Sequence, residues 1–116
     1  MRTHVVGERA FTDVATEDDL ERLCVSVHEA LRAGAIGFST SRTPNHITAD
    51  DRPVASRVAD WSEVRAIVNA MGDVNAGVFG IAGETTGRDP QRIREYLDRL
   101  RDLAVESRVP MTFGMF

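Results

Sequence analysis

The fold is decided by one stretch of the sequence, Leu31-Arg32-Ala33-Gly34-Ala35-Ile36-Gly37-Phe38-Ser39-Thr40-Ser41-Arg42-Thr43. It predicts the end of a helix, a glycine stop at Gly34, and a buried strand over 35–40. The residues then change abruptly to hydroxyls and a positive charge, from Ser41 to Thr43. In α/β proteins ligands bind at the carboxyl ends of strands, so this corner is a candidate binding site.

Three helices are predicted from apolar residues at helical spacing. Each follows a residue whose side chain can accept hydrogen bonds from free helical amides: Thr16, Asp60 and Asp89. Glu63, three residues after the second cap, gives a variant of the capping box. Pro90 suits the first turn of the third helix. Gly34 and Gly72 are predicted to end the first two helices, because glycine accepts the left-handed conformation.

Short apolar runs lie between the helices and predict strands. They cover Ala35–Thr40, Ala76–Ala82 and Val109–Phe116, and His4–Val6 is a fourth candidate near the start. Strands that alternate with helices indicate βαβ crossovers and a parallel sheet. The predicted fold class is therefore α/β, with three or four parallel strands and three helices in one domain over residues 1–116.

The predicted connections from strand to helix are longer than those from helix to strand. The longest, 41–59, exceeds what a connector needs, and loops of that length often carry function. In a (βα)8 barrel the catalytic face is built from the strand-to-helix loops. Because a closed barrel needs about eight strands, and the chain ends inside an apolar run, we expect part of a larger TIM-type barrel.

The composition excludes several classes of partner. The 116 residues carry a formal net charge of −4 and a pI near 5.3, which argues against nucleic acid as the main partner. The one cysteine, Cys24, permits no internal disulfide and is expected to be a small buried thiol. No signal peptide and no run long enough to span a membrane are found, so a cytoplasmic location is expected.

Several segments together resemble one enzyme family. They are Ala33–Thr43 with Asn45-His46, then Val5–Ala10, Ala15–Leu20, Asp50–Val54 and Val109–Phe113. They resemble the amidohydrolase superfamily, and within it the branch of D-aminoacylases and N-acyl-D-amino-acid deacylases. The resemblance covers nearly all of this chain but only an internal part of a family member.

The resemblance implies a barrel enzyme that hydrolyses the C–N bond of N-acyl amino acids or related amides. In that family zinc or a similar divalent metal activates the attacking water. The family's ligands include His-x-His, which this chain lacks: its histidines, His4, His28 and His46, are far apart. The matching strand, 77–83, also lacks the histidine that the family commonly has there. No metal ligand, cofactor or catalytic residue is therefore assigned, and the chain alone is expected to be inactive.

The candidate substrate-binding residues are Ser41, Arg42 and His46. Arg42 could hold a substrate carboxylate with two parallel hydrogen bonds, and His46 could orient a polar group. Alternatively, these residues only satisfy the backbone of a turn-rich loop. Glu84, after the next strand, is expected to be a solvated loop acid.

Two further functions stay open. One is a non-catalytic α/β module that forms a homo-oligomer through exposed strand edges. The other is a stand-alone binder of small carboxylates that uses Arg42 and His46.

Overall fold

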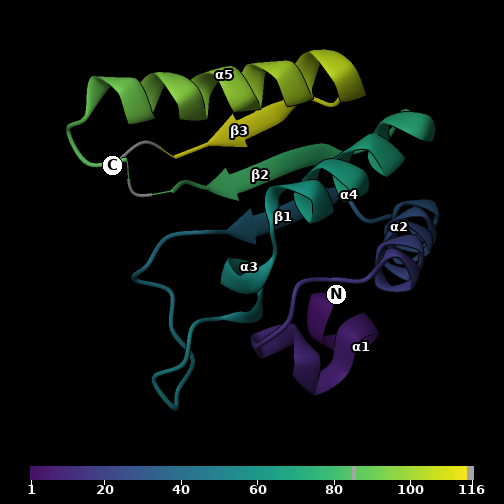
Figure 1. Ribbon diagram of the computed structural model, residues 1–116. Helices are drawn as coiled ribbons and strands as arrows, with labels where there is room; N and C mark the ends of the chain where they lie inside the picture. Colours follow the sequence, from purple (N-terminus) through teal and green to yellow (C-terminus); the bar gives the residue numbers. More distant parts are fainter. Residues whose placement is uncertain (85, 115–116) are drawn as a thin grey trace.

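A parallel sheet of three strands forms the centre of the computed structural model, which describes residues 1–84 and 86–114 (Figure 1). The strands are β1 (Gly37–Ser41), β2 (Val78–Ala82) and β3 (Met111–Phe113), and they lie side by side in chain order. Phe38 pairs with Phe79, which pairs with Met111. The predicted α/β class with parallel strands is confirmed, while the predicted strand residues 115–116 lie outside the described part.

The three predicted helices are present as α2 (Glu17–Arg32), α4 (Trp61–Asp73) and α5 (Pro90–Ser107). Their caps are confirmed, because Thr16, Asp60 and Asp89 each accept a hydrogen bond from a first-turn amide. The capping box predicted at Asp60 is only half formed. The side chain of Glu63 binds Arg2 instead of returning to the cap.

The fourth predicted strand is wrong, because His4–Val6 belongs to a short helix, α1 (Arg2–Val6). Arg2, Val5 and Val6 are its buried residues, and they are spaced three and four apart. That spacing places them on one face of a helix, whereas a strand would turn neighbouring side chains to opposite sides. A 3₁₀ helix, η1 (Gly7–Phe11), follows directly.

The long connection after β1 has structure of its own. Ile47 and Pro53 form an isolated antiparallel bridge, and a short helix, α3 (Ala55–Val58), leads into α4. The Ser56 hydroxyl donates to the backbone oxygen of Ser41 over 2.8 Å. This bond ties α3 to the carboxyl end of β1, so the loop is anchored next to the candidate site.

One face of the sheet is covered by helices. Phe79 and Ile81 of β2 are buried in the core, and Phe38 of β1 stacks on Phe79 with ring centroids 5.9 Å apart. Their neighbours in the core come from α2, α4 and α5: Leu23, Val27, Val64, Ile67, Val68, Met71, Leu100 and Leu103. Figure 1 shows α4 and α5 running along the sheet, and α2 beside α4.

The opposite face of the sheet is open and carries small residues. Ser39, Gly80 and Thr112 are aligned across the three strands. A Cβ built on Gly80 would lie 3.4 Å from the Ser39 Cβ and 3.6 Å from the Thr112 Cγ2, so all three face the same side. Ser39 and Thr112 are exposed. Because parallel sheets normally have both faces covered, this open face is the unusual feature of the fold.

Gly72 does not end α4, which continues to Asp73. A Cβ built on Gly72 would lie 2.2 Å from the backbone oxygen of Ser107, at the end of α5. The glycine is therefore needed for the close approach of the two helices. Gly34 does follow the end of α2 as predicted, with φ at 104°.

We expect Gly72→Ala to destabilise the protein by about 1–3 kcal/mol, because the added methyl group clashes with backbone. In an unobstructed helix the same change would stabilise by up to about 1 kcal/mol. Urea unfolding measures the sign directly, with Arg94→Ala on the exposed surface of α5 as the control. A stabilised Gly72→Ala variant would show that α4 and α5 are further apart.

Candidate functional site

A groove of about 810 Å³ lies at the carboxyl ends of the three strands. It is lined by residues of the strands and of the long loop: Ser39, Thr40, Ser41, His46, Val54, Ser56, Gly80, Ile81, Ala82, Thr112, Phe113 and Gly114. The groove continues the open face of the sheet. Parallel strands end at the same edge, and this brings residues from three distant parts of the sequence together.

Ser41 is the buried polar residue of this groove, with 8% of its surface exposed. Its Oγ is buried and has no hydrogen-bond partner among the described residues. Its backbone oxygen, in contrast, accepts the hydroxyl of Ser56. Most buried polar atoms in proteins have a partner. The Ser41 hydroxyl therefore has its donor and acceptor capacity unused among the described residues.

His46 lies in the loop that borders the same groove, and its side chain is exposed. The loop is fixed by the Arg57 guanidinium, whose Nη1 donates to the backbone oxygens of Pro44 and His46. The His46 amide donates to the Thr43 oxygen over 3.2 Å. The structure thus brings two of the three predicted binding residues, Ser41 and His46, to one groove.

Arg42 is the third predicted binding residue, and it does not line this groove. Its Nε donates to Glu84 Oε1 over 2.8 Å, and its Nη1 donates to the backbone oxygen of Ala59. Glu84 also pairs with Arg99 over 3.4 Å. The binding role of Arg42 stays a prediction, and its guanidinium would have to leave Glu84 and Ala59 to perform it.

Glu84 is not the solvated acid that the sequence predicts. Its side chain is 27% exposed and lies between Arg42 and Arg99. Arg99 in turn lies over the ring of Trp61, 5.2 Å from its centroid. These contacts connect the residues after β1 and β2 with α4 and α5. They hold the ends of the strands in place, and the single carboxylate of Glu84 is shared by two guanidinium groups.

Tyr96, on α5, is a second buried group near these strand ends. Its hydroxyl has no hydrogen-bond partner among the described residues. Burial, with the negative charge of Glu84, raises the pKa of Tyr96 above its usual value of 10.0. The hydroxyl therefore stays protonated and remains a potential donor at neutral pH.

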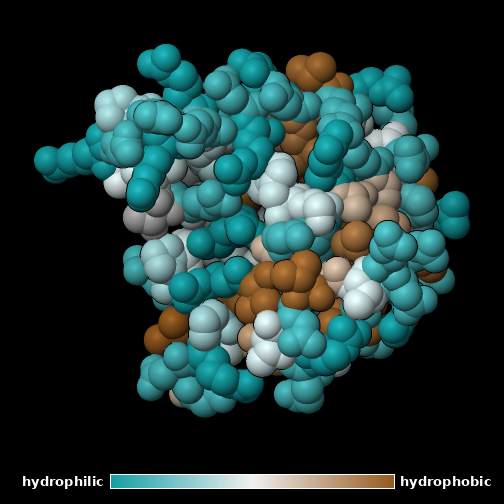
Figure 2. Space-filling view, in the orientation of Figure 1, coloured by the Kyte–Doolittle hydropathy of each residue, from teal (hydrophilic) through white to brown (hydrophobic). Residues whose placement is uncertain are grey.

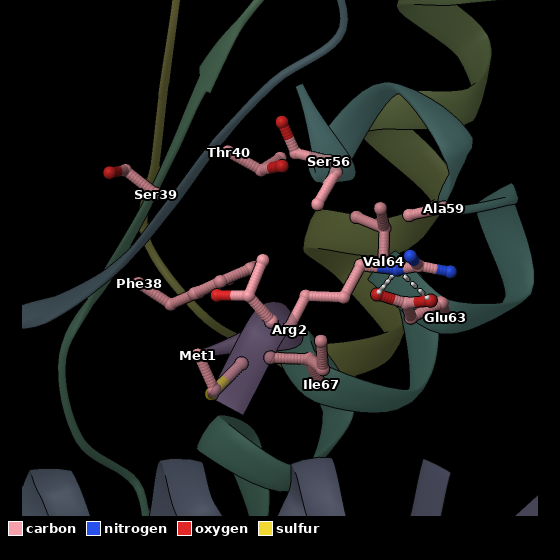
Figure 3. Close-up of a pocket in the computed structure, with 12 residues that line it drawn as sticks. Met1, Arg2, Phe38, Ser39, Thr40, Ser56, Ala59, Glu63, Val64 and Ile67 are labelled. Carbon is pink, nitrogen blue, oxygen red and sulfur yellow. Dashed lines mark hydrogen bonds and ion pairs between the residues drawn. The ribbon is translucent and has the colours of Figure 1, made fainter. Parts of the chain in front are cut away.

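A separate cavity of about 210 Å³ lies on the covered side, between α1, β1, α3 and α4 (Figure 3). Figure 3 shows Phe38 and Ser39 on one side of it, and Glu63 and Val64 on the other. Arg2 Nε donates to both oxygens of Glu63, over 3.0 and 2.9 Å. Figure 2 shows the surface in the orientation of Figure 1. An apolar patch lies near the middle of the face that is turned to the viewer, and largely hydrophilic residues surround it.

The Arg2–Glu63 pair is structural in character. Burial raises the pKa of Glu63, while the hydrogen bond and charge of Arg2 act in the opposite direction. Arg2 Nη1 and Nη2 donate to the backbone oxygens of Ala10 and Asp13, so each of the three guanidinium nitrogens has a partner within the protein. The pair fastens α1 and the segment after it to α4.

His28 and Cys24 lie away from both cavities and pack α2 against α4. Nε2 of His28 is 2.7 Å from the Ala70 oxygen, and the Cys24 thiol is 3.6 Å from the Ala66 oxygen. Cys24 is only partly buried, and burial raises the pKa of its thiol. Both contacts serve helix packing.

Four hydroxyls of the groove were not predicted from the sequence: Ser39, Thr40, Ser56 and Thr112. Ser39 could have been found, because it stands two residues before Ser41 and side chains alternate along a strand. Ser56 and Thr112 could not, since their places depend on how α3 folds back and on the register of β3.

In the described part of the chain, no three His, Cys, Asp or Glu side chains are arranged to hold a metal ion. The residues therefore do not fit the metal centre that the family resemblance implies. Among the described helices, none combines the length and the apolar character that crossing a bilayer requires.

Comparisons of the chain with protein-family models, with curated proteins and with solved structures found no match.

Proposed function

We propose that this chain forms one wall of the substrate-binding site of an amidohydrolase-type barrel enzyme. The reaction of that enzyme is hydrolysis of the amide C–N bond of N-acyl amino acids or related amides. The groove beside Ser41 and His46 holds the substrate. The metal that activates water in such enzymes is held by other segments, because residues 1–84 and 86–114 offer no ligand set for it.

The observation that carries the proposal is the arrangement of the sheet. Its strands follow chain order, and α2, α4 and α5 pack on the buried side chains of one face. A doubly wound sheet reverses its strand order and has helices on both faces. A (βα)8 barrel keeps chain order, places every helix outside and turns the other face inward. The open face of this sheet supports the second arrangement.

The position of the groove supports a binding role. Binding sites of (βα)8 barrels lie at the carboxyl ends of the strands, among the loops that follow them. The groove lies at that edge, and its polar residues come from β1, β3 and the loop after β1. The reaction class comes from the sequence resemblance over Ala33–Thr43 with Asn45-His46. Fold position alone would not specify it.

The test is a chimera in which residues 1–116 replace the matching segment of a D-aminoacylase. We expect a folded barrel with metal-dependent hydrolysis of N-acetyl-D-amino acids. Ser41→Ala should lower kcat/KM about fivefold, the value of one hydrogen bond. Ser26→Ala, on α2 and away from the groove, should leave it unchanged.

Circular dichroism and bound-metal analysis establish that the chimera is folded and loaded before activity is measured. A folded, metal-loaded chimera without turnover would contradict the proposed function. So would metal-dependent hydrolysis by the 116-residue chain alone, since a substrate wall has no reaction centre of its own.

A second candidate function, self-association, is favoured by the exposed apolar residues at the sheet. Ile36 is 91% exposed, and Val78 and Phe113 are 45% and 44% exposed. In the described part of the chain, β1 and β3 each pair with β2 alone, which leaves an edge of each strand free for another copy. Light scattering over a concentration series tests this, and a monomer at every concentration would exclude it.

A further inference from the structure

The outer edge of β1 directs backbone groups away from the sheet. Just before and just after this strand, the Ile36 oxygen accepts a hydrogen bond from β2 and the Arg42 amide donates one to β2. Successive residues of a strand direct their N–H and C=O groups to opposite sides, so every second residue between these two also bonds to β2. The backbone groups of Gly37, Ser39 and Ser41 therefore lie on the outer edge.

Ser41 and Ser39 differ in what they meet at this edge. The Ser41 oxygen accepts the hydroxyl of Ser56 from α3, over 2.8 Å. The backbone N–H and C=O of Ser39 have no hydrogen-bond partner among the described residues. The Ser39 side chain is on the open face, so it is the backbone of this residue that lines the cavity of Figure 3.

That cavity lies against β1 on the covered side and has a volume of about 210 Å³. Most of its lining is apolar, with contributions from Phe38, Ala55, Ala59, Val64 and Ile67. The two charged residues in the lining, Arg2 and Glu63, bind each other. An apolar cavity of about 150 Å³ holds a benzene molecule. This cavity therefore has room for one large aliphatic or aromatic side chain.

An extended peptide segment fits the edge and the cavity at the same time. Its backbone carries an N–H and a C=O at the spacing of β1, and neighbouring strands lie about 4.8 Å apart. Every second side chain of such a segment points to the covered side, where the cavity is. Addition of a strand to an exposed sheet edge is a common mode of recognition, in which main-chain bonds give affinity and side-chain pockets give specificity.

We propose that the outer edge of β1 accepts an extended segment as a fourth strand, which pairs with the Ser39 backbone and places one large apolar side chain in the cavity of Figure 3. The inference rests on the proposed function, because each strand of a closed barrel has a neighbour on both sides. It deepens that function by stating what joins the barrel wall at β1 and which kind of side chain it brings.

The test is a titration of the ¹⁵N-labelled chain with the acetylated and amidated peptide Lys-Thr-Val-Leu-Val-Thr-Lys, followed by NMR. We expect the amide signal of Ser39 to shift and its hydrogen exchange to slow, because its N–H gains a partner. Replacing the central leucine of the peptide by alanine should weaken binding about tenfold, since the cavity is then left unfilled.

Substitutions at Ser39 separate its backbone from its side chain. Ser39→Pro removes the outward N–H and leaves the bonds to β2 intact, because proline is tolerated at a strand edge. It should weaken binding at least about fivefold. Ser39→Ala should leave binding unchanged, and so should Phe113→Pro, the matched control that removes an outward N–H of β3. Circular dichroism checks that each variant folds, and the alanine peptide keeps the test decisive if Ser39→Pro does not.

The absence of a Ser39 shift at about 1 mM peptide would overturn the inference. So would shifts at Met111 and Phe113 that only Phe113→Pro removes, because they would place the added strand at β3. A chain that dimerises without peptide, and is monomeric as Ser39→Pro, would make a second copy the occupant instead. An active chimera without peptide binding would remove this inference alone, whereas peptide binding with an inactive, metal-loaded chimera would remove only the proposed reaction.

Discussion

Phe79→Ala is expected to reduce the free energy of unfolding by about 3–5 kcal/mol, the usual cost of removing a buried aromatic ring. Phe79 lies on the central strand, is 0% exposed and stacks on Phe38. Its ring belongs to the core that the sheet forms with the helices of the covered face. Small domains are stable by about 5–15 kcal/mol, so one substitution removes a large part of the total.

Urea unfolding with circular dichroism measures the loss. The matched control is Phe113→Ala, on the neighbouring strand, whose side chain is 44% exposed. It should cost about 1 kcal/mol or less. Phe79→Leu provides a variant that still folds if Phe79→Ala does not, and it should give a smaller loss. Equal losses at Phe79 and Phe113 would contradict the difference in burial between the central strand and the edge strand.

Arg2→Met is expected to cost about 3–5 kcal/mol, because it leaves the buried carboxylate of Glu63 without its partner. The two side chains are 7% and 3% exposed. The backbone oxygens of Ala10 and Asp13 also lose donors. The matched control is Arg65→Met, which breaks an ion pair of the same 2.9 Å length to Glu106 at an exposed site. That change should cost about 1 kcal/mol or less.

The loss in Arg2→Met should depend on pH. Burial already raises the pKa of Glu63 above its usual 4.5, and removing Arg2 removes the influence that opposes this rise. A carboxyl group with a raised pKa favours the folded state when protonated, and this contribution is lost as the pH rises through the folded pKa. The difference from the parent protein should thus be largest at neutral pH and shrink on acidification. A pH-independent difference would show that the carbonyl contacts, and not the charge, dominate.

The sequence predicted well what depends on neighbouring residues. The caps at Thr16, Asp60 and Asp89 each act within one helical turn, and all three are present. The strands also followed from local apolar runs. The assignment of His4–Val6 as a strand failed because three residues are too few to distinguish the period of a helix from that of a strand. The helix is favoured by the burial of Arg2, two residues before His4, and that burial depends on Glu63, which is 61 residues away.

Part of the candidate site could also be predicted, because that part depends on residues that are close in the sequence. Ser41 and His46 were expected at one corner because both lie close to the end of one strand, and the structure brings them to one groove. The partner of Arg42 is Glu84, 42 residues further along the chain, and only the pairing of β1 with β2 brings them together. The sequence also did not show that position 72 requires glycine, because the atom that a side chain there would meet is the backbone oxygen of Ser107. Contacts between distant segments determine these roles.

The open face of the sheet is the feature on which the proposed wall depends, and thiol labelling tests it most directly. Cys24 is first replaced by alanine, and a cysteine is then placed at Ser39 on the open face or at Val68 in the covered core. We predict that Ser39→Cys reacts about as fast as a free thiol at low protein concentration. Val68→Cys should react at least about 100-fold more slowly. Equal protection of both positions at every concentration would contradict the open face and the binding wall proposed from it.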